Sequence, residues 1–207
     1  PEFYTDSWHY NDCRKHSIFL SQTRYPVKGA HILFEALPQL IRKYPDLEVY
    51  IAGDNITKGE LRVKGTGYGL LLKNRIKKLG IEKHLCFMGA LTAEEMKNAL
   101  LKSNVFVCPS SIENSSNSLG EAQILGVPCI ASYVGGSPDF IQNEFMGELY
   151  RFEDATMLAY KIESVFENDC FDNAIMQQKS RDRHDASENI KRTLEIYNCI
   201  LNGGKYE

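Results

Sequence analysis

The stretch VFVCPSSIENSSNSLGEAQILGVPCIAS, residues 105–132, decides the fold. It opens with an apolar run that ends in Pro and two Ser, a pattern typical of a buried strand, and it closes with a second apolar run. Between the two runs lie a polar loop and a short helical segment that stops at Gly126. We expect Glu113 in the loop just beyond the first strand and Glu121 inside the helix, with both side chains facing one crevice.

The loop that opens this helix is rich in Asn and Ser, and two interpretations fit it. Free backbone N–H groups and the positive end of the helix dipole suit a phosphate, and Glu121 suits the hydroxyls of a neighbouring sugar. The loop is then a pocket for a phosphorylated sugar. Alternatively it only caps the helix, with Ser116, Asn117 or Ser118 as the N-cap residue. Spacing alone favours neither interpretation, because two Glu at this separation recur by chance.

Length and charge limit the possible classes of protein. A chain of 207 residues is long enough for one large α/β domain and too short for two, which predicts a single core. A formal net charge of −3 gives no electrostatic reason to expect a nucleic-acid partner. No apolar run approaches the length of a membrane span, and no signal peptide is visible. The chain begins with Pro1 rather than Met, so we expect that an N-terminal portion is missing.

The cysteines show no metal-binding pattern. They form no C-x-x-C pair and have no His at the spacing of a zinc site, which predicts no structural metal. Cys86, Cys108 and Cys129 lie in or beside apolar strand patterns, where a free Cys behaves as a small hydrophobic residue. We therefore expect reduced core thiols and a cytosolic compartment.

The rest of the chain alternates between strand and helix patterns. Further strands are expected at residues 17–22, 47–53, 84–89 and 146–152. Helices are expected from 28 or 29 to 43 and at 70–79, 91–103, 154–167, 171–183 and 187–201. This alternation predicts an α/β fold with a Rossmann-like parallel sheet that has helices on both faces.

Local signals add detail to this outline. Thr92 followed by Glu95 predicts a capping box, and Pro38 predicts a kink in the first helix. Residues 55–69 are expected to form an irregular loop, and the basic helix at 70–79 is expected to present a solvated face.

Polar loops follow the carboxyl ends of several predicted strands, where ligands collect in such sheets. They are the loop with Arg24 and Lys28, the turn at 88–91, the loop from Glu113 to Glu121, and the Gly135-Gly136 turn. The two glycines either allow a ligand to approach the backbone closely or form a tight turn. No G-x-G-x-x-G follows the first strand, which argues against an NAD-dependent dehydrogenase.

Taken in order, these motifs resemble the C-terminal, donor-binding domain of the retaining glycosyltransferases of family 4, which have the two-domain GT-B architecture. The resemblance runs from about residue 17 to residue 167. It is carried by SIFLSQTRYPVKG, YIAGD, CFMGAL, CPSSIENSSNSLGEAQILGVPCIAS and VGGSPDFI.

The resemblance implies roles for individual residues. Glu113 and Lys28 correspond to the catalytic positions, Glu113 beside the transferred sugar and Lys28 beside the departing diphosphate. Glu121 corresponds to the residue that binds the ribose hydroxyls. The other implied donor-binding residues are Arg24, Ala90, Leu91, Ser116, Asn117, Ser118, Leu119, Gly135 and Gly136.

Two loops depart from the family pattern. Thr23 stands where the family usually has Arg, and Arg24 follows one place later, either reaching the diphosphate or pointing to solvent. Asn114 and Ser116 replace glycines that many members carry, which implies an altered sugar preference.

The resemblance also implies a division of the chain. Residues 1–16 would be an interdomain linker, residues 17–186 the nucleotide-sugar-binding domain, and residues 187–207 a helical tail that docks on a missing N-terminal domain.

The function implied is retaining transfer of a hexosyl unit from a nucleotide sugar to a glycan or lipid-linked acceptor, without a metal or other cofactor. The expected setting is surface polysaccharide synthesis, such as capsule or lipopolysaccharide, in the cytoplasm or at the inner face of the membrane. This chain alone would transfer nothing. A nucleotide-sugar epimerase or hydrolase on the GT-B fold, or a non-catalytic nucleotide-binding module, are the alternatives.

Overall fold

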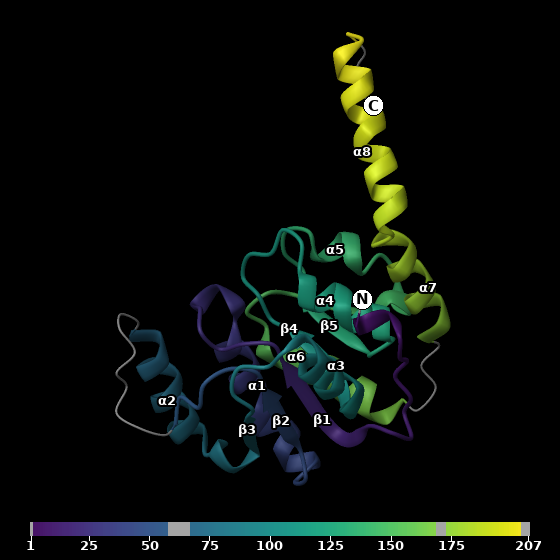
Figure 1. Ribbon diagram of the computed structural model, residues 1–207. Coiled ribbons are helices and arrows are strands. Elements are labelled where there is room, and N and C mark those ends of the chain that lie inside the picture. The colour runs from purple at the N-terminus through teal and green to yellow at the C-terminus, as the bar shows by residue number, and fades with distance from the viewer. Residues whose placement is uncertain (1, 58–66, 169–172, 204–207) are drawn as a thin grey trace.

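The computed structural model describes residues 2–57, 67–168 and 173–203 (Figure 1). Its centre is a parallel six-stranded sheet in the order β3-β2-β1-β4-β5-β6. The strands are β1 (Arg14–Leu20), β2 (Glu48–Ile51), β3 (Leu85–Phe87), β4 (Ser103–Cys108), β5 (Cys129–Ser132) and β6 (Glu148–Tyr150). The predicted parallel Rossmann-like sheet is confirmed.

Helices cover both faces of this sheet. The helices are α1 (Ala30–Lys43), α2 (Gly67–Leu79), α3 (Ala93–Lys102), α4 (Asn117–Leu125), α5 (Ser137–Phe140), α6 (Ala155–Glu167), α7 (Asn173–Arg183) and α8 (Ala186–Leu201). Short 3-10 turns are η1 (Glu2–Tyr4), η2 (Pro26–Lys28), η3 (Glu82–His84) and η4 (Glu144–Met146).

The alternation of side chains along the central strands creates two cores. In β1, Ile18 and Leu20 face the core shared with α1, α2 and α6, whereas Phe19 faces the core shared with α3 and α4. All three side chains are buried, as expected for a central parallel strand with both faces covered. Both faces of the sheet are thus covered, and its loops rather than its faces are available for ligands.

Several predicted boundaries shift in the structure. Strand β1 begins at Arg14 and ends at Leu20, so Ser21 and Gln22 belong to the following loop. Most of the predicted irregular loop, residues 58–66, lies outside the described residues, and Gly67–Gly69 form the start of α2 instead. Helix α1 continues through Pro38, and the predicted capping box of Thr92 and Glu95 is confirmed at the start of α3.

The N-terminal segment packs on the domain. Trp8 is buried, its Nε1–H donates to the Ser103 carbonyl at 2.7 Å, and its backbone N–H donates to the Leu125 carbonyl at 2.8 Å. Lys97 on α3 forms an ion pair with Asp6 at 2.8 Å. These contacts join the segment to α3 and α4, and its role as an interdomain linker stays a prediction.

The prediction for Cys86 is wrong. Cys108 and Cys129 are buried free thiols as expected, but Cys86 is exposed. It lies in β3, the strand at one edge of the sheet, and an edge strand has fewer neighbours to cover its outward side chains. Local apolar pattern alone does not reveal that edge position.

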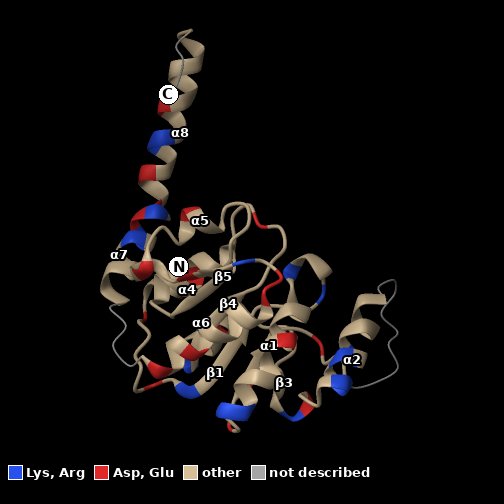
Figure 2. Cartoon of the chain, turned by 180° about the vertical axis from the view of Figure 1, so that it is seen from behind, with Lys and Arg blue, Asp and Glu red and all other residues tan. Residues whose placement is uncertain are grey.

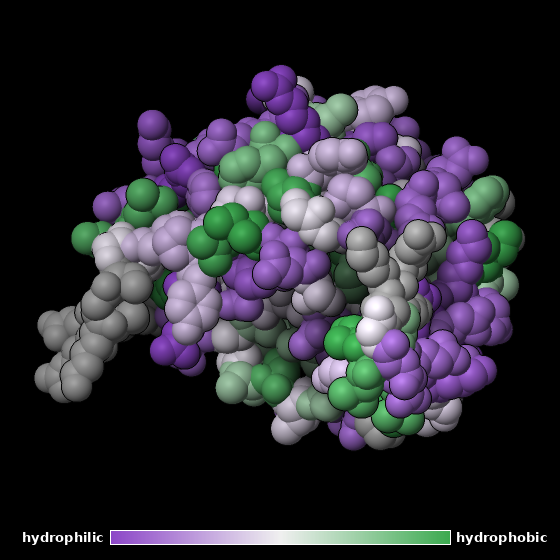
Figure 3. All heavy atoms as spheres, turned by 90° about the horizontal axis from the view of Figure 1, so that it is seen from above, coloured by the Kyte–Doolittle hydropathy of each residue, from purple (hydrophilic) through white to green (hydrophobic). Residues whose placement is uncertain are grey.

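The C-terminal helix α8 stands out from the domain (Figure 1). None of its residues is buried, and Ile190, Leu194, Tyr197 and Leu201 are all at least half exposed. Both basic and acidic residues lie along the same helix (Figure 2). Seen from above, the surface of the molecule shows apolar residues among polar ones (Figure 3).

Candidate functional site

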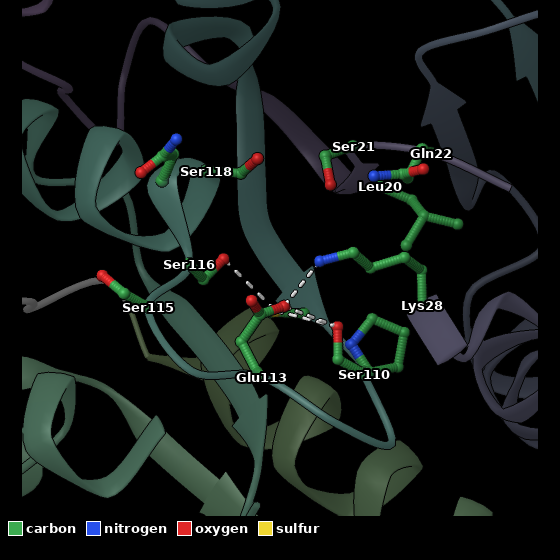
Figure 4. Close-up of a pocket in the computed structure, with 12 residues that line it drawn as sticks. Leu20, Ser21, Gln22, Lys28, Ser110, Glu113, Ser115, Ser116 and Ser118 are labelled. Carbon is green, nitrogen blue, oxygen red and sulfur yellow. Dashed lines mark hydrogen bonds and ion pairs between the residues drawn. The ribbon is translucent and has the colours of Figure 1, made fainter. Parts of the chain in front are cut away.

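Two loops meet at the carboxyl ends of the central strands. Strands β1 and β4 are parallel neighbours, so the loop after β1 and the loop after β4 leave the same edge of the sheet side by side. They enclose a cavity of about 220 Å³ that also reaches the start of α4 (Figure 4). Hydroxyl groups from Ser21, Ser110, Ser115, Ser116 and Ser118 line this cavity. The predicted meeting of the Lys28 and Glu113 loops is confirmed.

An ion pair crosses the cavity. Lys28 Nζ lies 2.7 Å from Glu113 Oε2, and the Ser110 hydroxyl donates to the same oxygen at 3.1 Å. Figure 4 shows the Lys28 side chain reaching toward Glu113, which lies next to Ser110. The Glu113 side chain is 10% exposed and that of Lys28 is 30% exposed. A carboxylate this buried requires such compensation, since an unpaired buried charge is strongly unfavourable.

The backbone around Lys28 is fixed by its neighbours. The short turn η2 begins at Pro26, whose ring presets the backbone, and ends in Gly29 with φ of 69°. A Cβ atom at Gly29 would lie 1.7 Å from the Pro109 carbonyl oxygen, so only glycine fits there. The Ser111 N–H donates to the Val27 carbonyl at 2.7 Å. The two loops are thus joined through main-chain atoms.

Gly135 and Gly136 support the Glu113 loop from behind. The Gly136 N–H donates to the Glu113 carbonyl at 2.8 Å. A Cβ atom would lie 2.0 Å from the Glu113 carbonyl oxygen at Gly135, and 1.9 Å from the Asn114 carbonyl oxygen at Gly136. Neither glycine lines the cavity. In this structure, the glycines allow close approach of another loop.

The predicted cap at the start of α4 is confirmed, and the phosphate-binding interpretation stays a prediction. Ser116 is the N-cap residue, and its Oγ accepts the Leu119 N–H at 3.3 Å. Asn117 and Ser118 line the cavity, and within the described residues their backbone N–H groups have no recorded acceptor. The Leu119 side chain is fully buried. Two of the three predicted N–H groups are therefore available to an anion, and that of Leu119 is occupied by the cap.

Glu121 lies apart from this arrangement. It occupies the second turn of α4, is half-buried, and does not line the cavity. Within the described part of the chain it makes no recorded ion pair or side-chain hydrogen bond, and burial raises the pKa of its carboxyl group. An incoming hydroxyl group is the kind of donor that such a carboxylate lacks.

Three other predicted donor-binding residues are not brought to the cavity. Arg24 is exposed, with its guanidinium 5.5 Å from the centre of the Tyr25 ring. Ala90 is exposed and Leu91 is half-buried, just after the antiparallel bridge between Gly53 and Gly89. Ala90 and Leu91 follow the edge strand β3, and Leu91 packs against the core shared with α3 and α4.

Ser110 and Cys108 are among the residues of the cavity that were not predicted. Ser110 is 1% exposed and directs its hydroxyl to Glu113, whereas the adjacent Ser111 donates to the Val27 carbonyl. The sequence holds no signal that separates these two serines. Cys108 also lines the cavity, and burial raises the pKa of its thiol, which keeps the thiol protonated and unreactive at neutral pH.

No group of three or more His, Cys, Asp or Glu side chains among the described residues is arranged to hold a metal ion. No helix in the same residues is both long and apolar enough to cross a membrane.

The chain is similar to proteins of known family. The family described as glycosyl transferases group 1 matches residues 10–192. The GPI3 subunit of the phosphatidylinositol N-acetylglucosaminyltransferase of Saccharomyces cerevisiae is 22% identical over 178 residues, which cover 85% of this chain. A GDP-mannose-dependent phosphatidylinositol monomannoside mannosyltransferase of Corynebacterium glutamicum is 29% identical over 123 residues, which cover 56% of this chain and 29% of that protein.

The fold is shared with solved structures. HepE of Anabaena, crystallised with UDP and glucose, superposes with a TM-score of 0.74 at 22% identity, covering 87% of this chain and 48% of HepE. The open parallel sheet is thus that of GT-B glycosyltransferase structures. The chain spans 37% of the length of the yeast subunit.

Proposed function

The chain belongs to the family of glycosyl transferases group 1, and on this premise we propose that it is the donor-binding part of a retaining glycosyltransferase of family 4. The proposed reaction moves a hexosyl unit from a nucleotide sugar to an acceptor. The observation that carries the proposal is the cavity in which the Lys28–Glu113 pair faces the start of α4.

A diphosphate matches the charge of this cavity. The amino group of Lys28 and the two free N–H groups of Asn117 and Ser118 converge on it, and the start of a helix adds a positive partial charge. Lys28 would stabilise the negative charge that builds on the diphosphate as the sugar leaves, a task for which the proposal requires no metal ion.

The hydroxyl-rich wall matches a sugar. Ser21, Ser115 and Ser118 both donate and accept hydrogen bonds, as sugar hydroxyls do. Glu113 would contact the transferred sugar and stabilise developing positive charge, and Glu121 would bind the ribose. Asn114 and Ser116, in place of glycine, would adjust the sugar preference, and Arg24 would have to leave Tyr25 to reach the diphosphate.

The rest of the reaction is assigned to the whole protein. We propose that α8 docks on an N-terminal domain through its exposed apolar residues, and that this domain contributes the acceptor site. The acceptor would be a glycan or a lipid-linked intermediate of surface polysaccharide synthesis in the cytoplasm or at the inner face of the membrane. The names of two relatives specify phosphatidylinositol compounds and different sugars, which supports a lipid-linked acceptor but leaves the donor open.

A thermal-shift screen with UDP, GDP, ADP and their sugars tests the proposal. One nucleotide should raise the melting temperature, since a ligand at about 100 times its Kd adds about 2.7 kcal/mol of stability. Lys28→Ala should remove this effect. Lys83→Ala is the matched control, because Lys83 is exposed and lies before β3, at the opposite edge of the sheet. If none of the nucleotides raises the melting temperature, the proposal is refuted.

A further inference from the structure

One oxygen atom of Glu113 receives two donors of different character. Oε2 accepts from Lys28 Nζ at 2.7 Å and from Ser110 Oγ at 3.1 Å. Ser110 is almost completely buried, whereas the Lys28 side chain is 30% exposed and borders the open cavity (Figure 4). Within the described residues, Oε1 of Glu113 has no recorded partner. A ligand in the cavity can thus reach Lys28 but cannot replace Ser110.

An incoming diphosphate competes with Glu113 for Lys28. Lys28 is the one basic side chain among the described residues that line the cavity, so both anions depend on the same ammonium group. A diphosphate close to an ionised carboxylate is unfavourable unless a cation stands between them. The flexible Lys side chain can turn toward the larger charge, but the carboxylate is then left with fewer donors.

We infer that Lys28 exchanges Glu113 for the diphosphate when the donor binds, and that Ser110 is the positioning residue that then holds the Glu113 carboxylate. This inference rests on the proposed function and adds to it an order of events and a residue. The neighbouring strand fixes Ser110 in turn, because the Ser132 hydroxyl on β5 donates to the Ser110 carbonyl. A serine side chain also loses little conformational freedom when it is held in place.

The exchange predicts opposite effects for substitution of Glu113 and for substitution of Ser110. Glu113→Gln keeps the size of the side chain but removes the competing charge, so the nucleoside diphosphate selected in the screen should bind about two- to fivefold tighter. Ser110→Ala should weaken binding about threefold, because the bound state then contains a buried carboxylate without a side-chain donor. Titration calorimetry on the 207-residue chain measures both effects.

A double-mutant cycle separates positioning from general support. In the Glu113→Gln background, Ser110→Ala should have little further effect, since there is no charge left to hold. Ser110→Thr retains the hydroxyl and should restore the original affinity. Ser111→Ala is the matched control, because its hydroxyl donates to the Val27 carbonyl rather than to Glu113.

The outcomes distinguish the two proposals. Failure of the unchanged chain to bind any nucleoside diphosphate overturns the proposed function and the exchange together. Normal binding combined with weaker binding by Glu113→Gln overturns the exchange alone. An equal loss from Ser110→Ala in both backgrounds, or no rescue by Ser110→Thr, overturns the positioning role. Melting curves of each variant exclude loss of binding through unfolding.

Discussion

Glu113 and Glu121 belong to the same unit of strand, loop and helix, but their surroundings are opposite. Glu113 is buried and receives a cation, a hydroxyl group and, on its carbonyl, a backbone N–H from a third loop. Glu121 is half-buried and has no recorded partner among the described residues. The Glu113 carboxylate is positioned without a ligand, whereas the Glu121 carboxylate keeps its capacity to accept hydrogen bonds. Preorganisation of this kind suits a group that acts on the reacting bond.

The largest expected effect concerns chemistry in the full-length protein. Glu113→Ala should lower kcat for transfer about a hundredfold, in the range seen when a preorganised electrostatic group is removed. Glu121→Ala should chiefly raise KM for the donor. Steady-state kinetics with a matched acceptor measures both, and equal losses in kcat would abolish the distinction between the two carboxylates.

Gly136→Ala tests the contact between the glycine turn and the loop that carries Glu113. The new Cβ atom would lie 1.9 Å from the Asn114 carbonyl oxygen, so the two loops must separate. Overpacking of this kind costs about 1–3 kcal/mol, measurable by urea unfolding. Gly67→Ala is the control, because a Cβ atom there meets nothing within 4 Å. Unchanged stability of Gly136→Ala would show that the loop contact is dispensable.

Glu121→Ala tests the dependence of this residue on a ligand. Loss of hydrogen bonds to the ribose should weaken nucleotide binding about tenfold, equivalent to about 1.4 kcal/mol. The unliganded chain should lose little stability, because this carboxylate makes no ion pair or side-chain hydrogen bond within the described residues. Calorimetry checks the affinity, and unchanged binding would remove Glu121 from the donor site.

Ser116→Ala tests the N-cap of α4, which lies between Glu113 and Glu121 in the sequence. Removal of the hydroxyl that accepts the Leu119 N–H should cost about 1 kcal/mol of stability, the usual effect of losing an N-cap. Ser115→Ala, at an exposed neighbouring position, should cost less. Urea unfolding compares the two, and equal effects would argue against the cap.

The smallest expected effect is the pH dependence of stability that the half-buried Glu121 carboxyl contributes. Burial raises the pKa of this carboxyl above its usual value of 4.5, so its ionisation is less favourable in the folded state. Its stabilising contribution is complete below pH 4.5 and is lost as pH rises through the raised pKa. Glu121→Gln should therefore become relatively more stable than the unchanged chain over that window. A stability difference that stays constant with pH would contradict the assignment.

The sequence allows prediction of the features that depend on local pattern. Apolar runs and helical periods locate the sheet, and the parallel order places Lys28 and Glu113 at one edge. Features set by tertiary neighbours are not visible in it. The exposure of Cys86 depends on β3 being an edge strand, and the different partners of Ser110 and Ser111 depend on side-chain direction within one loop. The glycine pair is likewise explained only by the loop that packs against it.

The joining of the loops by main-chain atoms has a consequence for evolution and engineering. The bonds from Ser111 to Val27 and from Gly136 to Glu113 use backbone groups, so exchange of an exposed side chain in the Glu113 loop removes no atom of either bond. Asn114 and Ser115 are exposed on this frame. Under the proposed function, exchange of these two loop side chains should change the sugar preference and leave the geometry that holds the carboxylate in place.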